Sequence, residues 1–112
     1  CILGAKMDPV FGPVVMFGLG GIFTEIMADV SLRRAPVGVE TAMEMIDELK
    51  GRPLFEGARG AKPVDKRMIA EAISKLSVFA AAHKDAIESI EMNPQRVMPD
   101  RCVALDALIV KK

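Results

Sequence analysis

Residues 87–112, IESIEMNPQRVMPDRCVALDALIVKK, hold the pattern that decides the fold: two alternating apolar and polar stretches around the loop MPDR (98–101). Pro99 suits the second position of a four-residue turn, which makes Val97 the partner of Cys102. In an antiparallel pair the numbers of opposed residues keep a constant sum, here 199 for 97 and 102. The stretch therefore predicts a β-hairpin with a defined register.

This register brings polar groups together on one face of the hairpin. Asn93 falls opposite Asp106 and Glu91 falls opposite Leu108, with Cβ atoms of opposed residues about 4.5–5.5 Å apart. The other face is apolar and is expected to face the core; it carries Ile90, Met92, Val103, Leu105, Ala107 and Ile109.

Two carboxylates and an amide on one face offer hard oxygen ligands, which Mg²⁺ prefers in proteins. Acidic residues also occur often on the solvated face of an edge hairpin, and the pattern alone leaves both interpretations open. A loop shifted by one residue would remove the opposition of Asn93 and Asp106.

The rest of the chain predicts three strands followed by two helices. Alternation or β-branched residues favour strands over 1–7, 14–17 and 28–36, the last ended by Pro36. Apolar residues recur at helical spacing over 39–51 and again over 66–83, where Asp65 is placed to cap the second helix. Strands, two helices and a terminal hairpin predict an α+β fold, an antiparallel sheet with both helices packed on one face.

Length and composition exclude several classes of protein. The 112 residues suffice for one domain with a modest core, and no apolar run approaches the roughly 20 residues that span a bilayer. With 15 basic and 15 acidic residues the chain has no net charge, so nothing favours binding to nucleic acid or an anionic membrane. Cys1 and Cys102 fit neither a disulfide framework nor a zinc site, which favours reduced thiols in a cytoplasmic protein.

Three further features could carry chemistry or could be structural. The glycines at 18, 20 and 21 match neither a dinucleotide-binding fingerprint nor a Walker loop, but they allow backbone to approach a ligand or another strand. Arg59, among small residues, could bind a phosphate or be solvated. His83 ends the second helix, where a cation is explained by the helix dipole.

Four blocks of this sequence, in this order, resemble a known family: DPVFGPVVMFGLGGIFTEIMADVSLRRAP (8–36), LFEGARGAKPVD (54–65), IEMNP (90–94) and VALDALI (103–109). They are similar to the C-terminal part of the ATP-grasp domain of NDP-forming acyl-CoA synthetases, relatives of succinyl-CoA synthetase. Members of that family interconvert an acyl-CoA, a nucleoside diphosphate and phosphate with the free acid, CoA and the triphosphate, through an acyl phosphate and a phosphohistidine on a mobile segment.

The resemblance implies roles for particular residues. Asn93 and Asp106 match magnesium ligands, and Glu91 matches an acidic position beside them. Gly20 and Gly21 are implied to bind the nucleotide phosphates. Glu25 and Arg59 are implied to act near the phosphates or the incoming phosphohistidine segment.

It also implies that residues 1–112 form one partial domain, the C-terminal half of an ATP-grasp domain in a longer chain; the start within a strand points the same way. Mg²⁺ and ATP or ADP are then the cofactors, and CoA binds to other domains of the parent protein. The partners are the nucleotide and those other domains, with self-association possible. The isolated piece is expected to be inactive.

Two other functions remain open from the sequence. Synthetase-like regions also occur as non-catalytic, ligand-sensing modules of protein acetyltransferases. A plain α+β interaction domain without a ligand would also fit the composition and the element order.

Overall fold

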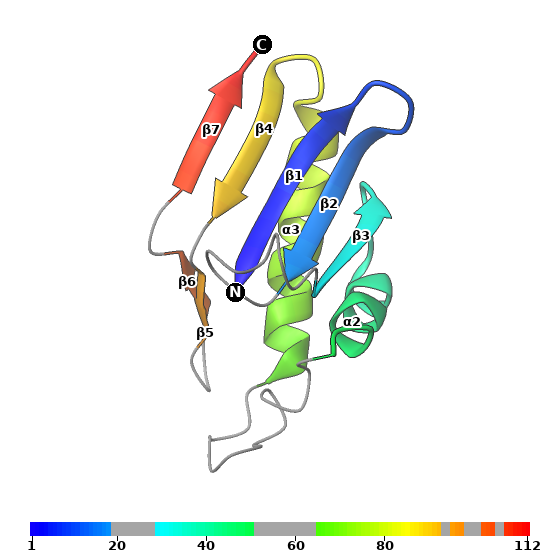
Figure 1. Cartoon of the computed structure of the whole chain (residues 1–112), viewed down its shortest axis with the longest axis vertical. Helices are drawn as coiled ribbons and strands as arrows, with labels where there is room; N and C mark the ends of the chain where they lie inside the picture. The colour runs from blue at the N-terminus through cyan, green and yellow to red at the C-terminus, as the bar shows by residue number, and fades with distance from the viewer. Residues whose placement is uncertain (19–28, 51–64, 93–94, 98–101, 105–106) are drawn as a thin grey trace.

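The computed structural model describes residues 1–18, 29–50, 65–92, 95–97, 102–104 and 107–112. Its main feature is a five-stranded antiparallel sheet in the order β3-β2-β1-β4-β7 (Figure 1). A separate two-stranded sheet pairs β5 with β6. The strands are β1 (Ile2–Asp8), β2 (Gly12–Gly18), β3 (Val30–Arg34), β4 (Ile87–Met92), β5 (Gln95–Val97), β6 (Cys102–Ala104) and β7 (Ala107–Lys111).

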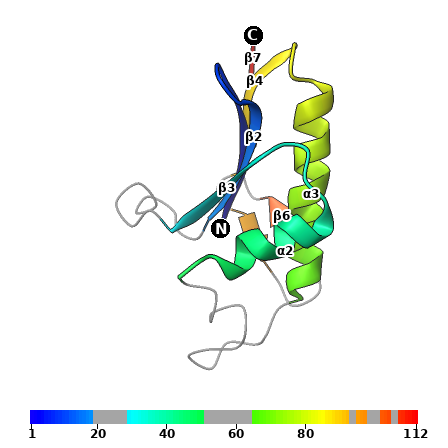
Figure 2. The same ribbon diagram turned by 90° about the vertical axis from the view of Figure 1, so that its right-hand side faces the viewer.

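Two helices, α2 (Val39–Asp47) and α3 (Lys66–Ala82), lie on one face of the sheet, and none of the described residues forms a helix on the other face (Figure 2). The predicted α+β class is therefore confirmed. The carboxylate of Asp65 accepts a hydrogen bond from the Arg67 amide at 3.0 Å, as expected of an N-terminal cap. Neither helix in the described part of the chain is long and apolar enough to cross a membrane.

The core lies between the helices and the sheet. Alternation along β1 and β2 sends Leu3, Ala5, Val15 and Phe17 toward the helices, and all four are buried. On the helices, the residues buried in this core recur at helical spacing: Ala42, Met45, Ile46, Ile69, Ile73, Leu76 and Ala80.

The buried hydroxyl of Ser77 has a hydrogen-bond donor and a hydrogen-bond acceptor as partners. Ser77 Oγ accepts a hydrogen bond from the Val37 amide at 2.9 Å and lies 2.7 Å from the Ser74 carbonyl, to which it can donate. Because its polar atom has partners, its burial in α3 carries no large desolvation cost. These bonds tie the segment before α2 to the middle of α3.

The turn between β1 and β2 is set by local polar chemistry. The carboxylate of Asp8 accepts hydrogen bonds from the amides of Val10 (2.8 Å) and Phe11 (2.9 Å), and Gly12 has a φ of 74°. These backbone hydrogen bonds hold the pKa of Asp8 below its ordinary value. Asp, Pro and Gly residues are typical of turns, and this turn aligns β1 with β2 over their full lengths.

The predicted hairpin register is confirmed both in the β4–β7 pair and in the β5–β6 pair. Val97 pairs with Cys102, and Glu91 pairs with Leu108. Gln95 with Ala104 and Met92 with Ala107 keep the same sum of 199. The expected hairpin is divided between two sheets, and the register shifts between Ile87 and Ser89.

The prediction that β7 contributes to the core is wrong. Ile90 is buried and Met92 packs against the core, but Ile109 is 49% exposed and every residue of β7 is exposed. The reason is that β7 is an edge strand, whereas α3 packs against β1 and β2 at the centre of the sheet. Val103 and Leu105, assigned to the same face, have side chains outside the described part.

Gly18 allows close approach of β2 and β3. A Cβ atom at this position would lie 2.5 Å from Val30 Cγ1 and 2.9 Å from the Asp29 carbonyl oxygen. The sequence left open whether the glycines let backbone approach a ligand or another strand. At Gly18 the glycine allows the close approach of the neighbouring strand, β3.

An ion pair joins β3 to the end of α2, and it predicts a pH effect. Arg33 donates to Glu48, which raises the pKa of Arg33 and lowers the pKa of Glu48. A lowered carboxyl pKa stabilises the fold above about pH 4.5, and this contribution is lost as the pH falls through the folded value.

In the complete protein, Glu48→Gln should therefore reduce the free energy of unfolding at pH 7, by no more than about 1 kcal/mol because the pair is partly exposed. The difference from wild type should shrink below pH 4.5. Urea denaturation at several pH values measures it, and a difference that grows as the solution is acidified would contradict the assignment.

Candidate functional site

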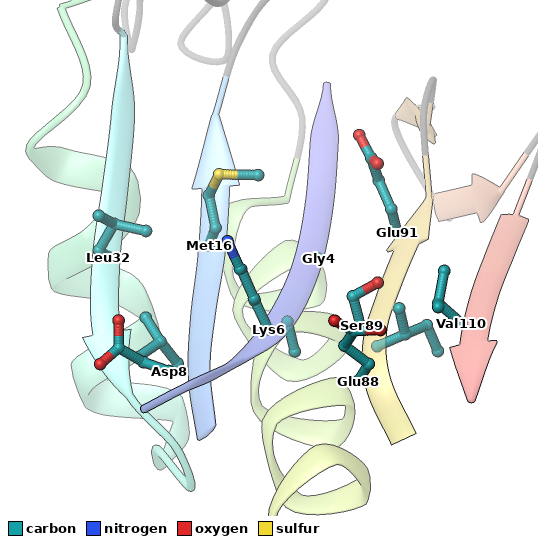
Figure 3. A pocket seen from close by; sticks show the side chains of 12 residues that line it. Gly4, Lys6, Asp8, Met16, Leu32, Glu88, Ser89, Glu91 and Val110 are labelled. Atoms are coloured by element: carbon teal, nitrogen blue, oxygen red, sulfur yellow. The ribbon is translucent and has the colours of Figure 1, made fainter. Parts of the chain in front are cut away.

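The face of the sheet opposite α2 and α3 carries a hollow of about 590 Å³ (Figure 3). Two rows of residues run across this face in the observed registers. The first row is Leu32, Met16, Gly4, Glu91 and Leu108. The second row is Arg34, Val14, Lys6, Ser89 and Val110.

Gly4, which has no side chain, forms the floor of this hollow with its backbone. It lies between Met16 of β2 and Glu91 of β4, so any side chain at this position would fill the space between them. A Cβ atom there would come within 3.0 Å of the Ile90 carbonyl oxygen and 3.6 Å of Glu91 Cα. The absence of a side chain keeps the centre of the face open.

The hollow has an apolar side and a polar side. Val14, Met16 and Leu32 line it from β2 and β3. Lys6 of β1 and Glu91 of β4 bring opposite charges, and both are exposed. Among the residues that the structure describes, neither forms a salt bridge.

Of the residues predicted to form the metal site, the structure describes Glu91. It stands on the open face beside the Gly4 floor, opposite Leu108 as the register required (Figure 3). Asn93 and Asp106 lie outside the described residues, as do Gly20, Gly21, Glu25 and Arg59. Within the described ranges there is no cluster of three or more His, Cys, Asp or Glu side chains that could hold a metal.

Glu91, the described member of the predicted metal site, has the chemistry of a ligand for a hard divalent cation. Glu91 offers an exposed carboxylate with no competing salt bridge in the described part of the chain. The missing Cβ of Gly4 leaves room beside it for a ligand. Mg²⁺ commonly takes one or two carboxylates and fills its other positions with water and phosphate oxygens.

His83 has the structural role that its sequence position indicated. Its ring stacks on Phe79 with the ring centroids 4.3 Å apart, and Nδ1 lies 2.9 Å from the Phe79 carbonyl oxygen. It thus occupies the C-terminal cap of α3, on the helix side of the sheet and away from the hollow.

Sequence reasoning missed Gly4 and Lys6. The signal was present in CILGAKM (1–7), where strict alternation places both residues on the face opposite Leu3 and Ala5. Their importance depends on the pairing of β1 with β4, which joins opposite ends of the chain. A local pattern does not contain that information.

Comparison with known proteins shows the family. The model of the ATP-grasp domain matches residues 1–110. The chain is 47% identical over 109 residues to acetate–CoA ligase (ADP-forming) I subunit beta of Pyrococcus furiosus, covering 97% of this chain and 47% of that protein. It is 42% identical over 97 residues to 4-hydroxybutyrate–CoA ligase (ADP-forming) of Nitrosopumilus maritimus, covering 87% of this chain and 14% of that protein.

The fold also matches a solved structure, the acetyl-coenzyme A synthetase 1 of Ca. Korarchaeum cryptofilum in complex with coenzyme A and Mg-AMPPCP. The TM-score is 0.92 at 39% identity, over 99% of this chain and 52% of that chain. The present chain thus spans about half the length of this structure and of the Pyrococcus subunit. It belongs to the ATP-grasp domain family, and its relatives are ADP-forming CoA ligases, in agreement with the resemblance seen in the sequence.

Proposed function

We propose that this chain is the C-terminal half of the ATP-grasp domain of an ADP-forming acyl-CoA synthetase, and that the sheet face opposite α2 and α3 contributes the magnesium and phosphate side of the nucleotide site. The observation that carries the proposal is the position of Glu91, in the predicted register, beside the open floor at Gly4. A relative that matches 99% of the chain was solved with Mg-AMPPCP, which supports the choice of ligand.

The proposed reaction step is phosphoryl transfer between a phosphohistidine and ADP. Glu91, Asn93 and Asp106 would hold Mg²⁺, which supplies neutralisation of phosphate charge when bound. The confirmed pairs on both sides of Asn93 and Asp106 support their opposition across the hairpin.

Other residues of the chain would position the reacting groups. The backbone amides at Gly20 and Gly21 would approach phosphate oxygens, as flexible glycine loops do in other phosphate sites. Arg59 would bind a phosphate oxygen with its forked guanidinium, and Glu25 would orient the phosphohistidine segment. Positioning and charge stabilisation of this kind supply most of the catalysis in phosphoryl transfer.

The remaining functions belong to other parts of the parent protein. CoA and the carrier histidine would lie in other domains, so the isolated half is expected to be inactive. Relatives named for acetate and for 4-hydroxybutyrate match the chain at 47% and 42% identity, which supports selection of the acyl group elsewhere in the parent. Cytoplasmic location and self-association stay predictions from the sequence.

The test is an assay of the complete parent protein with an acyl-CoA, ADP, phosphate and Mg²⁺. We expect formation of ATP that depends on all four components. A parallel thermal melt should show stabilisation by Mg²⁺ and ADP, about 2.7 kcal/mol at a ligand concentration 100 times the Kd. If no ATP forms from a panel of acyl-CoA substrates and the melt does not change, the plain interaction domain is the better account.

A further inference from the structure

We propose that Lys6 is a phosphate-binding residue of the nucleotide site, a role that the sequence motifs do not assign to it. The inference rests on the proposed function, because it takes the ligand of the hollow to be a nucleotide with its metal. It goes further in naming which side chain of the described sheet binds the polyphosphate.

The position of Lys6 makes this contact possible. It lies on β1 between Val14 of β2 and Ser89 of β4, one step along the open face from Gly4. Its side chain extends over the sheet on the same face as Glu91 (Figure 3). Lys6 and Glu91 are diagonal neighbours, which lie about 7–8 Å apart in an antiparallel pair, with the Cβ atoms somewhat closer.

The charge of Lys6 is available for a ligand. In the described part of the chain no carboxylate forms a salt bridge with it. Asp8 lies on the same strand and the Lys6 charge acts on its carboxylate, but the two residues form no salt bridge, and Asp8 Oδ1 accepts the Val10 and Phe11 amides of the turn. The ammonium group is exposed and keeps its three donors, and the Ser89 hydroxyl on the adjacent strand adds another polar group.

The spacing of the two charges suits a metal-bound polyphosphate. A divalent cation held by the Glu91 carboxylate would neutralise part of the charge of a bound polyphosphate and would leave the rest for another cationic group. Lys6 is the diagonal neighbour of Glu91, and Gly4 between them has no side chain that would block the way. The long, flexible side chain of Lys6 can therefore reach the remaining phosphate charge. An apolar ligand or a bare metal ion would offer the ammonium no hydrogen-bond acceptor.

The experiment compares Lys6→Met with Lys75→Met in the complete parent protein. Lys75 is exposed on α3, on the opposite side of the sheet, and serves as the matched control. Titration calorimetry with Mg²⁺ present gives the Kd for ADP and for adenosine. We expect Lys6→Met to weaken ADP about 10-fold and to leave adenosine unchanged, since one charge-assisted hydrogen bond is lost. Lys6→Arg should restore most of the ADP affinity.

Each other outcome overturns the inference in a distinguishable way. If wild type binds Mg²⁺ and ADP but Lys6→Met binds ADP as tightly as Lys75→Met does, Lys6 has no phosphate contact and the proposed function stands. Equal losses for adenosine and ADP would mean that Lys6 supports the shape of the hollow and does not bind phosphate. If wild type binds no Mg²⁺ and ADP, both the proposed function and this inference fail.

Discussion

Replacement of Asp106 by alanine in the complete protein should lower nucleotide-dependent turnover at least about 100-fold while the fold stays intact. The expected loss is large because the carboxylate is proposed as a direct magnesium ligand, and phosphoryl transfer depends on the metal for charge neutralisation. Turnover is measured as ATP formation from an acyl-CoA, ADP and phosphate.

Asp85→Ala is the matched control for this prediction. Asp85 is exposed between α3 and β4, on a turn that lies outside the hollow. Its variant should retain turnover, and both variants should melt within a few degrees of wild type. Near-normal turnover of Asp106→Ala under the same Mg²⁺ concentration would exclude Asp106 as a required ligand.

The largest expected effect on stability comes from Phe17→Ala. Phe17 is 1% exposed on the core face of β2, where α3 packs against the sheet. Removal of its ring loses buried apolar surface and leaves a cavity, which together cost about 3–5 kcal/mol for a buried phenylalanine. Urea denaturation of the complete protein measures the change in the free energy of unfolding.

Phe11→Ala offers a matched phenylalanine on the surface. Phe11 is 55% exposed in the β1–β2 turn, and its ring lies 5.7 Å from the guanidinium carbon of Arg34. Its loss should cost no more than about 1 kcal/mol, the range of an exposed cation–π contact. Equal effects of the two variants would mean that the core is not centred between β2 and α3.

Much of the fold was predictable because it depends on local pattern. Alternation predicted the strands, helical spacing predicted α2 and α3, and Asp65 was recognised as the cap of α3. The turn predicted at Pro99 also gave the register that places Glu91 opposite Leu108, since one pair of opposed residues fixes all the other pairs of an antiparallel ladder.

The parts that were not predicted depend on contacts between distant segments. Alternation assigns Ile109 to the same face as Ile90, but it does not reveal that α3 covers the centre of the sheet and leaves the edge exposed. Likewise, helical spacing alone does not reveal that Met45 of α2 and Ser77 of α3 are buried. Coverage of a face is a property of tertiary packing.

For the site, the sequence identified Glu91 but missed the floor at Gly4 and the charge at Lys6. Both depend on β1 lying beside β4, a pairing between the two ends of the chain. The family resemblance supplied the other site residues, Gly20, Gly21, Glu25, Arg59, Asn93 and Asp106. Their roles stay predictions because these residues lie outside the described part of the structure.

Our central proposal is that the sheet face opposite α2 and α3 holds the metal of a magnesium–nucleotide site. Glu91 tests it most directly, because the structure describes its position on that face. The measurement is the Kd for ADP with and without Mg²⁺, for wild type, for Glu91→Gln and for a control, Glu71→Gln on α3.

We predict that Mg²⁺ tightens ADP binding in wild type and in Glu71→Gln, and that Glu91→Gln loses most of this gain, about 10-fold in Kd. Magnesium-dependent binding of ADP to Glu91→Gln at wild-type strength would contradict the claim.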